Sequence, residues 1–402
     1  MKSVCLLTQS QYELDPRVRR KAEALVSAGY SVDVLSLRMN PEKKDYTLNG
    51  VNVYTFSLSK KRGSLARYVF EYAAFFLWAL VRLSLLMRQR QYAVIDVNTL
   101  PDFLIFAAVP AKWMGAKLVL DMHEITPEFF ISKYGVREDS WRIRFIQRLE
   151  KISFDVANHV ITINEPITDL LAQRGLLRSK STVIMNAADE TRFAARSTPQ
   201  TDVGPTDSET FIMMYHGTLT KIYGLDIALE AFALAHTEMP GAELWILGSG
   251  PEKSALSDLA KERGLASKVK MIGQVASTDI PAWLSQCNIG ILPIRQDVFL
   301  DFAFPNKLPE FIIMGKTVIV SRLRAIRHYF SEEALAYFDP NNPVDLSEQM
   351  VRIYRNPQLR GRLALKARDE YAPIRWSVMK ERYLQLIEKS VGMRTEAIGQ
   401  SR

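Results

Sequence analysis

The 402-residue chain contains only two cysteines, Cys5 and Cys287, which lie far apart in the sequence. Two cysteines exclude a disulfide framework and a cysteine-based metal site, and they favour a reducing compartment. No other spacing in the sequence suggests a metal site. The N-terminus has one lysine before an apolar run of about five residues, which is too short for a secretory signal. We therefore expect a cytoplasmic protein.

Net positive charge is small in the second half of the chain. The net charge is +8, with 27 Lys and Arg against 20 Asp and Glu in residues 1–195 and 25 against 24 in the remainder. A basic half suggests an anionic partner such as a membrane leaflet, a phosphate-bearing substrate or nucleic acid, and a solvated basic face is the alternative. Aromatic residues do not alternate with the basic run Arg17–Lys21, and no recognition motif is present, so we expect no nucleic acid.

Long hydrophobic runs are absent except for Val69–Met87, whose only charged residues are Glu71 and Arg82. Its length reaches the threshold of about 18 residues for a transmembrane helix. Basic residues flank it on both sides. It lies between two predicted strands of one domain, and a charge near the bilayer centre is costly, which argues against spanning. A core helix and an interfacial helix on the cytoplasmic leaflet are the other two interpretations.

Short apolar runs alternate with helical patterns through both halves, as expected for parallel strands in βαβ units. The predicted strands of the first half are Val4–Leu7, Val32–Leu37, Val51–Phe56, Val94–Val97, Lys117–Leu120, His159–Ile163 and Thr182–Met185. Those of the second half are Phe211–His216, Glu243–Leu247, Lys268–Ile272, Ile289–Pro293, Thr317–Val320 and Ala336–Phe338. Two such series predict an α/β protein with two Rossmann-like, doubly wound domains.

A polar stretch rich in Pro and Gly, without periodicity, marks the predicted linker at residues 196–208. We accordingly predict an N-terminal domain over residues 1–195 and a C-terminal domain over residues 209–370. Residues 371–402 are predicted to form a helical segment that crosses back to the N-terminal domain.

Three loops of the second half have the composition of phosphate-binding turns. Gly217 opens the first, and Gly248 and Gly250 shape the second; glycine lets the backbone approach a ligand closely. Each loop alone is weak evidence, because glycine-rich turns end many parallel strands. Since ligands of open α/β sheets bind outside the carboxyl ends of the strands, the loops together predict a nucleotide-diphosphate pocket.

The third loop precedes a predicted helix. Asn306 is a natural N-cap that would leave first-turn amides free for an anion, and Lys307 adds a positive charge at the same place. Glu310 lies one turn further on and would repel phosphate, so we expect it to accept hydrogen bonds from ribose hydroxyls. A glutamate in a first helical turn is also common for dipole reasons alone.

The run HGTLTKIYGLDIALEAF, followed by LGSGPE, MIGQV, ILP and PNKLPEFIIMGKTVIV, resembles the donor-binding half of glycosyltransferase family 4. Weaker similarities in the first half are DPRVRRKAEALVSAGYSVDVLSL, LVLDMHEITPE, HVITINEP and VIMNAADETRF. The resemblance implies the GT-B fold, in which two Rossmann-like domains face each other across a cleft. It also implies a retaining mechanism, a nucleotide-sugar donor in that cleft, and neither an essential metal nor a cofactor.

The resemblance also implies roles for individual residues. Glu310 matches the ribose-binding glutamate, Gly217 and Thr218 the loop facing the diphosphate, and His123 a histidine that contacts the donor sugar. A histidine after a buried strand is otherwise more often structural. The remaining matches are Ile272, Gly273 and Gln274 at the nucleobase, and Asp15 and Arg17 near the acceptor, where helix capping is the alternative.

Three positions depart from the family pattern. Where many members carry an acidic residue that holds the donor sugar, this chain has Phe302, with Asp301 adjacent. The Arg and Lys that hold the diphosphate in many members align with Thr218 and Tyr223, so Lys221 or Lys307 would have to supply the charge.

These features predict a retaining glycosyltransferase associated with the inner face of the cytoplasmic membrane. Its acceptor would be a lipid-linked or polysaccharide precursor, and the membrane contact would be peripheral and with anionic lipid. The alternatives are a nucleotide-sugar 2-epimerase on the same fold and a catalytically degenerate subunit that only binds nucleotide-sugar.

Overall fold

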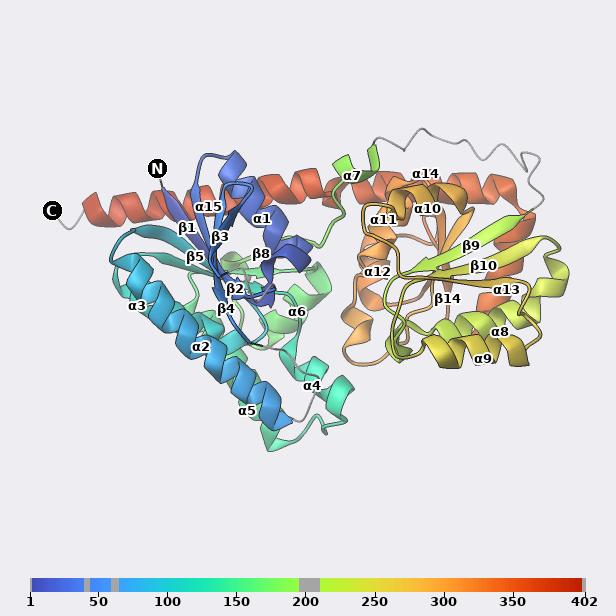
Figure 1. Ribbon diagram of the computed structural model, residues 1–402, viewed down its shortest axis with the longest axis horizontal. Coiled ribbons are helices and arrows are strands. Elements are labelled where there is room, and N and C mark those ends of the chain that lie inside the picture. The colour runs from blue at the N-terminus through green and yellow to red at the C-terminus, as the bar shows by residue number, and fades with distance from the viewer. Residues whose placement is uncertain (1, 40–43, 59–64, 195–209, 400–402) are drawn as a thin grey trace. The chain divides into compact units, whose positions relative to one another are not determined.

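The computed structural model describes residues 2–39, 44–58, 65–194 and 210–399. The chain divides into two compact units, of which the first comprises Met1–Met185 with Met379–Arg402 and the second Asn186–Val378. Figure 1 shows a central sheet with flanking helices in each unit. The predicted linker at residues 196–208 lies outside the described residues.

The first unit is built on an eight-stranded sheet of order β3-β4-β2-β1-β5-β6-β7-β8. All neighbouring strands pair in parallel except β3 and β4. The strands are β1 (Ser3–Gln11), β2 (Ser31–Leu37), β3 (Tyr46–Leu48), β4 (Val51–Phe56), β5 (Tyr92–Asn98), β6 (Lys117–Met122), β7 (His159–Thr162) and β8 (Ser181–Val183). The sheet reverses its winding direction between β1 and β5, which is where open α/β sheets bind ligands.

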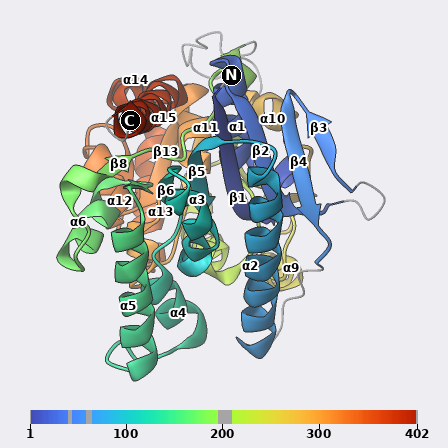
Figure 2. The same ribbon diagram turned by 90° about the vertical axis from the view of Figure 1, so that its left-hand side faces the viewer.

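The helices of this unit begin at residues that suit helix starts. Asp15 accepts from the amide of Arg17 at the start of α1, with Pro16 at the first helical position. Asn164 caps α6 in the same way. The helices are α1 (Pro16–Ser27), α2 (Leu65–Met87), α3 (Val109–Trp113), α4 (Thr126–Tyr134), α5 (Trp141–Val156), α6 (Glu165–Gln173) and α15 (Trp376–Gly399), with 3-10 turns η1 (Tyr12–Leu14), η2 (Asp102–Ala108) and η3 (Arg178–Lys180). Figure 2 shows α2, α3 and α5 below the sheet, where α2, α3 and α5 all contact η2.

Strand β3 was not among the predicted strands. It pairs antiparallel with β4 through a two-residue turn, Asn49 and Gly50, both of which have positive φ. An Asn-Gly turn is the usual signal of a tight hairpin. The strand has only three residues, so its apolar pattern is too short to be recognised without that turn.

The second unit holds a six-stranded parallel sheet of order β11-β10-β9-β12-β13-β14, the strand order of a Rossmann domain. Its strands are β9 (Phe211–His216), β10 (Ala242–Leu247), β11 (Val269–Gly273), β12 (Ile289–Leu292), β13 (Thr317–Ser321) and β14 (Ala336–Phe338). The winding direction reverses between β9 and β12. The prediction of two doubly wound parallel-sheet domains is thus confirmed.

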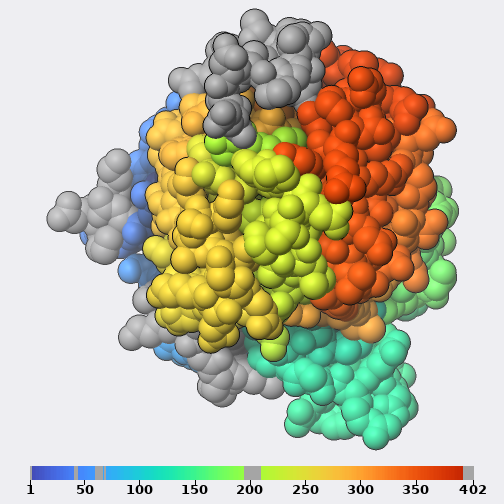
Figure 3. Space-filling model, turned by 90° about the vertical axis from the view of Figure 1, so that its right-hand side faces the viewer, coloured from blue at the N-terminus to red at the C-terminus, as the bar shows by residue number. Residues whose placement is uncertain are grey.

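Helices cover this second sheet on both faces. They are α7 (Thr191–Ala194), α8 (Leu225–Ala235), α9 (Lys253–Glu262), α10 (Ile280–Gln286), α11 (Lys307–Ile313), α12 (Arg324–Tyr329), α13 (Pro343–Arg355) and α14 (Pro357–Tyr371), with 3-10 turns η4 (Lys221–Tyr223), η5 (His236–Glu238), η6 (Leu300–Phe302) and η7 (Ala372–Ile374). Figure 3 shows α9, α8 and the α13–α14 pair side by side on the surface. Asn342 and Asn356 cap α13 and α14, each followed by a proline at the first helical position.

The two units divide at residues 185/186 and 378/379, whereas the sequence predicted boundaries at the linker and after residue 370. The C-terminal boundary falls inside α15. From Met379 onward this helix buries side chains at regular four-residue intervals against the first unit, namely Met379, Tyr383, Ile387 and Val391. The helical pattern continues through the boundary, so only these contacts reveal it.

Helix α2 covers the segment that the sequence marked as unusually apolar. Val69–Met87 is long and apolar enough to cross a membrane by length and composition alone, and 28% of its most apolar window is buried. The helix connects β4 to β5, which lie in the same sheet. It therefore serves as a crossover connection and leaves much of its surface exposed.

Candidate functional sites

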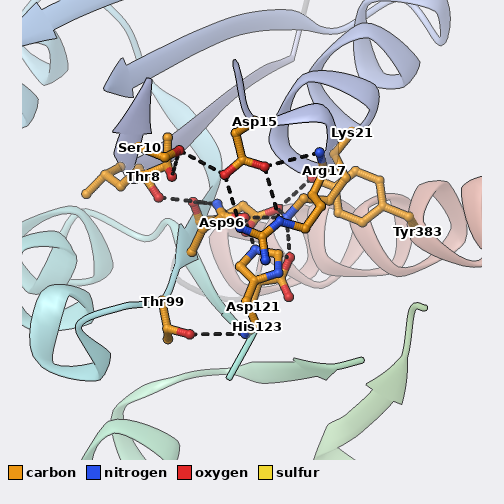
Figure 4. Close-up of polar contacts among 12 residues, drawn as sticks. Thr8, Ser10, Asp15, Arg17, Lys21, Asp96, Thr99, Asp121, His123 and Tyr383 are labelled. Carbon is orange, nitrogen blue, oxygen red and sulfur yellow. Dashed lines mark hydrogen bonds and ion pairs between the residues drawn. The ribbon is translucent and has the colours of Figure 1, made fainter. Parts of the chain in front are cut away.

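A cluster of buried polar residues lies at the carboxyl ends of β5 and β6 in the first unit. Figure 4 shows Lys21, Asp96, Asp121, His123 and Tyr383 converging there from α1, β5, β6, the loop after β6 and α15. All five side chains are buried. Burial of so many charges is costly unless they are paired, so the contacts among them decide whether the fold tolerates them.

The Lys21 ammonium lies at the centre of this cluster. It donates to Asp96 Oδ2 at 3.0 Å, to Asn98 Oδ1 at 2.7 Å and to Asp121 Oδ2. The Tyr383 hydroxyl donates to Asp96 Oδ2 at 2.7 Å. Burial alone would lower the pKa of Lys21, but Asp121 and Asp96 raise it, so the ammonium stays charged.

His123, the predicted donor-sugar contact, belongs to the same cluster. Its Nε2 lies 3.0 Å from Asn98 Oδ1 and 3.5 Å from Asp121 Oδ2, and its amide donates to Thr99 Oγ1 at 3.1 Å. Burial lowers the pKa of His123 well below its usual value, and the charges of Arg17 and Lys21 lower it further. The imidazole is therefore neutral.

Asp15 and Arg17, the predicted acceptor-side pair, bind each other. Arg17 Nε lies 3.1 Å from Asp15 Oδ1, and Ser10 donates to Asp15 Oδ2 at 2.9 Å. Burial alone would raise the pKa of Asp15, but the charge and hydrogen bonds of Arg17 hold it well below its usual range. Because Asp15 also caps α1, helix capping is one of its roles.

In the second unit, the loops that follow β9, β10 and β11 are hydrogen-bonded to one another. The amide of Gly217 donates to Leu247 O at 2.8 Å, and that of Leu219 donates to Ser249 O at 3.0 Å. The amide of Gly248 donates to Gly273 O at 2.7 Å. Two of the predicted loops, those of Gly217 and Gly248, thus form one surface with the end of β11 at the carboxyl ends of the strands.

Two of these loops approach so closely that no side chain fits between them. A Cβ at Gly248 would lie 1.8 Å from the carbonyl oxygen of Gly217, and one at Gly250 would lie 2.2 Å from that of Leu219. Gly217 has a φ of +129°. These glycines are therefore required by packing and backbone conformation, which accounts for the turn chemistry seen in the sequence.

Lys307 is brought onto the same surface. Its Nζ lies 3.9 Å from the ring centroid of Tyr223 and 5.1 Å from that of Tyr215. Its stem packs on Gly217, where an added Cβ would lie 2.1 Å from Lys307 Cε. Burial lowers the pKa of Lys307 to about 8, an effect that the charge of Glu310 opposes.

Glu310 faces His216 at the end of β9. Glu310 Oε2 lies 3.4 Å from His216 Nε2, and the His216 ring packs against Phe311 at a centroid distance of 5.2 Å. Burial lowers the pKa of His216 to about 3, and Lys307 lowers it further. Glu310 therefore faces a neutral imidazole.

The other predicted donor-site residues are placed less centrally. Asn306 occupies the N-cap position of α11, but its side chain makes no capping hydrogen bond, because its backbone is already helical (φ −57°, ψ −22°). The prediction of a side-chain N-cap there is wrong. Ile272 lies one residue before Gly273 on β11, and the Thr218 carbonyl accepts from the Tyr215 hydroxyl at 2.9 Å.

Within the part of the chain that the structure describes, the side chains of Lys221 and Asp301 do not contact Lys307. The Lys221 side chain is exposed, although the residue belongs to the loop after β9. Asp301 is paired with Arg324, whose Nε lies 3.2 Å from Asp301 Oδ2, and it accepts from Gln296 at 3.0 Å. Of the two lysines proposed to replace the missing cations, Lys307 has its ammonium near the rings of Tyr215 and Tyr223.

The sequence interpretation missed Lys21, Asp96, Asn98, His216 and Tyr383. Two of them carry a signal: Lys21 interrupts the buried face of α1 formed by Val18, Ala22 and Leu25, and Asp96 interrupts an apolar strand. A charged residue on a face that must be buried implies a buried partner. Among the described residues, no group of three or more His, Cys, Asp and Glu is placed to hold a metal ion.

Comparison with known proteins yields two family matches and several similar glycosyltransferases. Residues 14–187 match the glycosyl transferase 4-like domain, and residues 210–356 match glycosyl transferases group 1. The chain is 22% identical over 317 residues to the probable glycosyltransferase WbjE of Pseudomonas aeruginosa, covering 75% of each protein. It is 26% identical over 192 residues to the lipopolysaccharide core biosynthesis glycosyltransferase LpsD of Rhizobium meliloti, covering 47% of this chain and 52% of LpsD.

The crystal structure of Anabaena HepE in complex with UDP has a similar fold. Its TM-score is 0.69 at 16% sequence identity, and the match covers 97% of this chain and 100% of that one. At this identity the similarity shows the fold alone. It extends over both units.

Proposed function

Because this chain belongs to the family 4-like glycosyltransferases with the GT-B fold, we propose that it transfers a sugar, with retention of configuration, from a nucleotide-sugar donor to a hydroxyl acceptor. Membership of this family makes it a glycosyltransferase. The retaining mechanism, the donor and the acceptor are the proposal.

The observation that carries the proposal is the assembly of three sheet-edge loops with Lys307 and Glu310 in the second unit. The Gly217 loop is fixed against the Gly248 loop with no room for a side chain, and Lys307 packs on Gly217. A backbone surface with one cation suits a diphosphate, and a carboxylate nearby suits the ribose hydroxyls. The UDP complex of HepE makes uridine nucleotides the first donors to test.

The chemistry we propose follows from these groups. As the glycosidic bond to the diphosphate breaks, the Lys307 ammonium stabilises the charge that develops on the leaving group. The sequence contains no pair of carboxylates arranged for double displacement. We propose front-face attack by the acceptor hydroxyl, with its proton passing to the leaving phosphate, as the resemblance to family 4 implies.

The acceptor we propose is a lipid-linked or polysaccharide precursor, as the name of LpsD suggests for a related enzyme. Exposed apolar side chains on α2 and α5 support a peripheral location on an anionic membrane at the cytoplasmic face. On α2 these are Val69, Phe70, Leu77, Val81 and Leu85, and on α5 Trp141, Phe145 and Ile152. Helix α5 also carries Arg142, Arg144, Arg148 and Lys151 on its exposed surface.

Calorimetry with UDP and UDP-glucose, followed by mass spectrometry of products formed with a membrane-lipid extract, tests the proposal. Glu310→Ala should weaken UDP binding at least about tenfold, because charge-assisted hydrogen bonds are lost. Glu262→Ala, an exposed glutamate at the end of α9, is the matched control and should bind normally. Unaltered binding by Glu310→Ala would remove its ribose role.

The product analysis also separates the two alternatives. Conversion of the donor without any acceptor would identify a nucleotide-sugar 2-epimerase. Binding without turnover over a broad panel of acceptors would identify a catalytically degenerate subunit. A protein that binds no sugar nucleotide and no nucleoside diphosphate would overturn the proposed function.

A further inference from the structure

The orientation of the Asn98 side chain is fixed by its neighbours. Lys21 Nζ lies 2.7 Å from Asn98 Oδ1, and an ammonium can only donate, so the atom facing it must be the oxygen. On the other side, Asn98 Nδ2 donates to Leu7 O at 3.2 Å and to Asp96 Oδ1 at 3.3 Å. The hydrogen bonds of the Asn98 side-chain amide are therefore all consistent with a single orientation.

This orientation decides which nitrogen of His123 carries the proton. His123 Nε2 lies 3.0 Å from the same Asn98 oxygen, and a carbonyl oxygen only accepts. Nε2 must therefore be protonated and donate. Since the buried imidazole is neutral, Nδ1 is left with a lone pair and acts as an acceptor.

Nδ1 of His123 is buried and has no hydrogen-bond partner in the described part of the chain. A buried acceptor without a partner is costly, and ligand binding is a common reason for tolerating one. Asp121 Oδ1, on the neighbouring strand end, is a second buried acceptor without a described partner.

We propose that Lys21 and Asn98 are positioning residues that lock His123 in its Nε2–H form, so that Nδ1 accepts a hydrogen bond from a hydroxyl of the substrate. This inference rests on the proposed function for the existence of that substrate. It excludes a phosphate oxygen as the partner of His123, because phosphate offers only acceptors at neutral pH. The proposal also gives the buried Lys21 a role beyond its ion pairs, because Lys21 fixes the orientation of the Asn98 amide.

The protonation state can be measured without any ligand. Nitrogen-15 NMR of the histidine-labelled full-length protein, with His123 assigned through His123→Gln, reports which ring nitrogen bears the proton. We expect a single Nε2–H form for His123. In Asn98→Leu, which removes the acceptor, the spectrum should become a mixture of both forms, while His159, bonded to Thr182 in the same unit, stays unchanged.

The direction of the substrate contact is tested with donor analogues. Monodeoxy and monodeoxyfluoro forms of UDP-glucose are compared at each hydroxyl, since fluorine accepts weakly but cannot donate. At the position that faces His123, both analogues should lose about tenfold in kcat/KM, and His123→Gln should add no further loss for them. A fluoro analogue that reacts as well as the parent where the deoxy form fails would show that His123 donates.

The two measurements separate the possible failures. An Nδ1–H signal or a mixed signal in the ligand-free wild-type protein overturns the inference directly, whatever the enzyme's substrate proves to be. A pure Nε2–H signal in a protein that neither binds nor turns over any sugar nucleotide overturns the proposed function. In that case the assigned proton position still stands.

Discussion

At the scale of single residues, the most informative group is the Lys307 ammonium. It lies between two tyrosine rings and on Gly217, where burial has removed its water. Such a site favours the neutral amine, which is why the pKa of Lys307 falls to about 8. A bound diphosphate would restore the charge, so donor binding and proton uptake should be linked.

We therefore predict that UDP binding weakens as the pH rises through about 8, the pKa of Lys307. Above that pH the free protein holds a neutral amine that must be protonated on binding, which costs up to about tenfold in affinity per pH unit. Calorimetry from pH 6.5 to 9 measures this, and heats in buffers of different ionisation enthalpy should reveal proton uptake near pH 8. Lys307→Met serves as the control for titration of the nucleotide itself. A wild-type profile parallel to that of Lys307→Met would contradict the prediction.

Gly217 allows a second test of the same contact. A Cβ there would meet the Lys307 side chain, and the φ of +129° suits glycine alone, at a cost of about 1–3 kcal/mol for other residues. Gly217→Ala should displace Lys307 and weaken UDP binding about tenfold, with a lowered melting temperature. Gly264→Ala has a φ of +72° and nothing within 4 Å, so it should lower the melting temperature without changing UDP binding. Equal UDP affinity in the two variants would show that the close approach to Lys307 is unimportant.

At the scale of elements, the two sides of α2 differ in exposure. Phe75, Ala79 and Leu83 are buried against the unit, whereas Leu77 and Val81 on the outer side are 60% and 58% exposed. To pack on the sheet, a crossover helix needs only the buried apolar face formed by Phe75, Ala79 and Leu83. The exposed apolar face is therefore available for a membrane surface.

We predict that Val81→Glu reduces co-sedimentation of the protein with vesicles that contain anionic phosphatidylglycerol. The charge would enter the apolar boundary of the bilayer, while the folded unit should tolerate an exposed substitution. Leu365→Glu on α14, where Leu365 is 67% exposed in the second unit, is the matched control. Co-sedimentation that is indifferent to anionic lipid content, or equally reduced by both variants, would remove the membrane role of α2.

At the scale of the whole molecule, the chain folds as two units, and the first unit is built from two separate segments of the sequence. The C-terminal residues from Met379 complete the first unit, where Tyr383 bonds to Asp96 and Ile387 is fully buried. Two such units need not unfold in one step. A ligand that binds one of them should stabilise that unit alone.

Scanning calorimetry of the full chain should thus resolve two transitions. UDP at about 100 times its Kd should stabilise the second unit by about 2.7 kcal/mol and leave the first unchanged. Ile387→Ala should destabilise the first unit by about 2–5 kcal/mol through the cavity it leaves, while Gln385→Ala on the exposed side of α15 should have little effect. If Ile387→Ala lowered only the transition that UDP raises, the assignment of α15 to the first unit would be wrong.

The sequence alone determined the two parallel sheets and their chemistry-bearing loops. Apolar runs of strand length between helical patterns can be buried in only a few ways, and all thirteen predicted strands correspond to strands of the structure. Gly217, Gly248 and Gly250 were identified because close backbone approach needs glycine, a requirement that is local. Strand β3 was not predicted, because three residues are too few to show an alternating apolar pattern.

Only the tertiary structure decided which side chains meet. Lys21, Asp96 and Tyr383 lie far apart in the sequence. They come together because α1 and α15 pack near the carboxyl end of β5. The packing of Lys307 near the rings of Tyr215 and Tyr223, and the exposure of Lys221, depend on tertiary structure in the same way. Pairing of distant side chains depends on how whole elements are placed, and the periodicity that identifies an element contains no information on its neighbours.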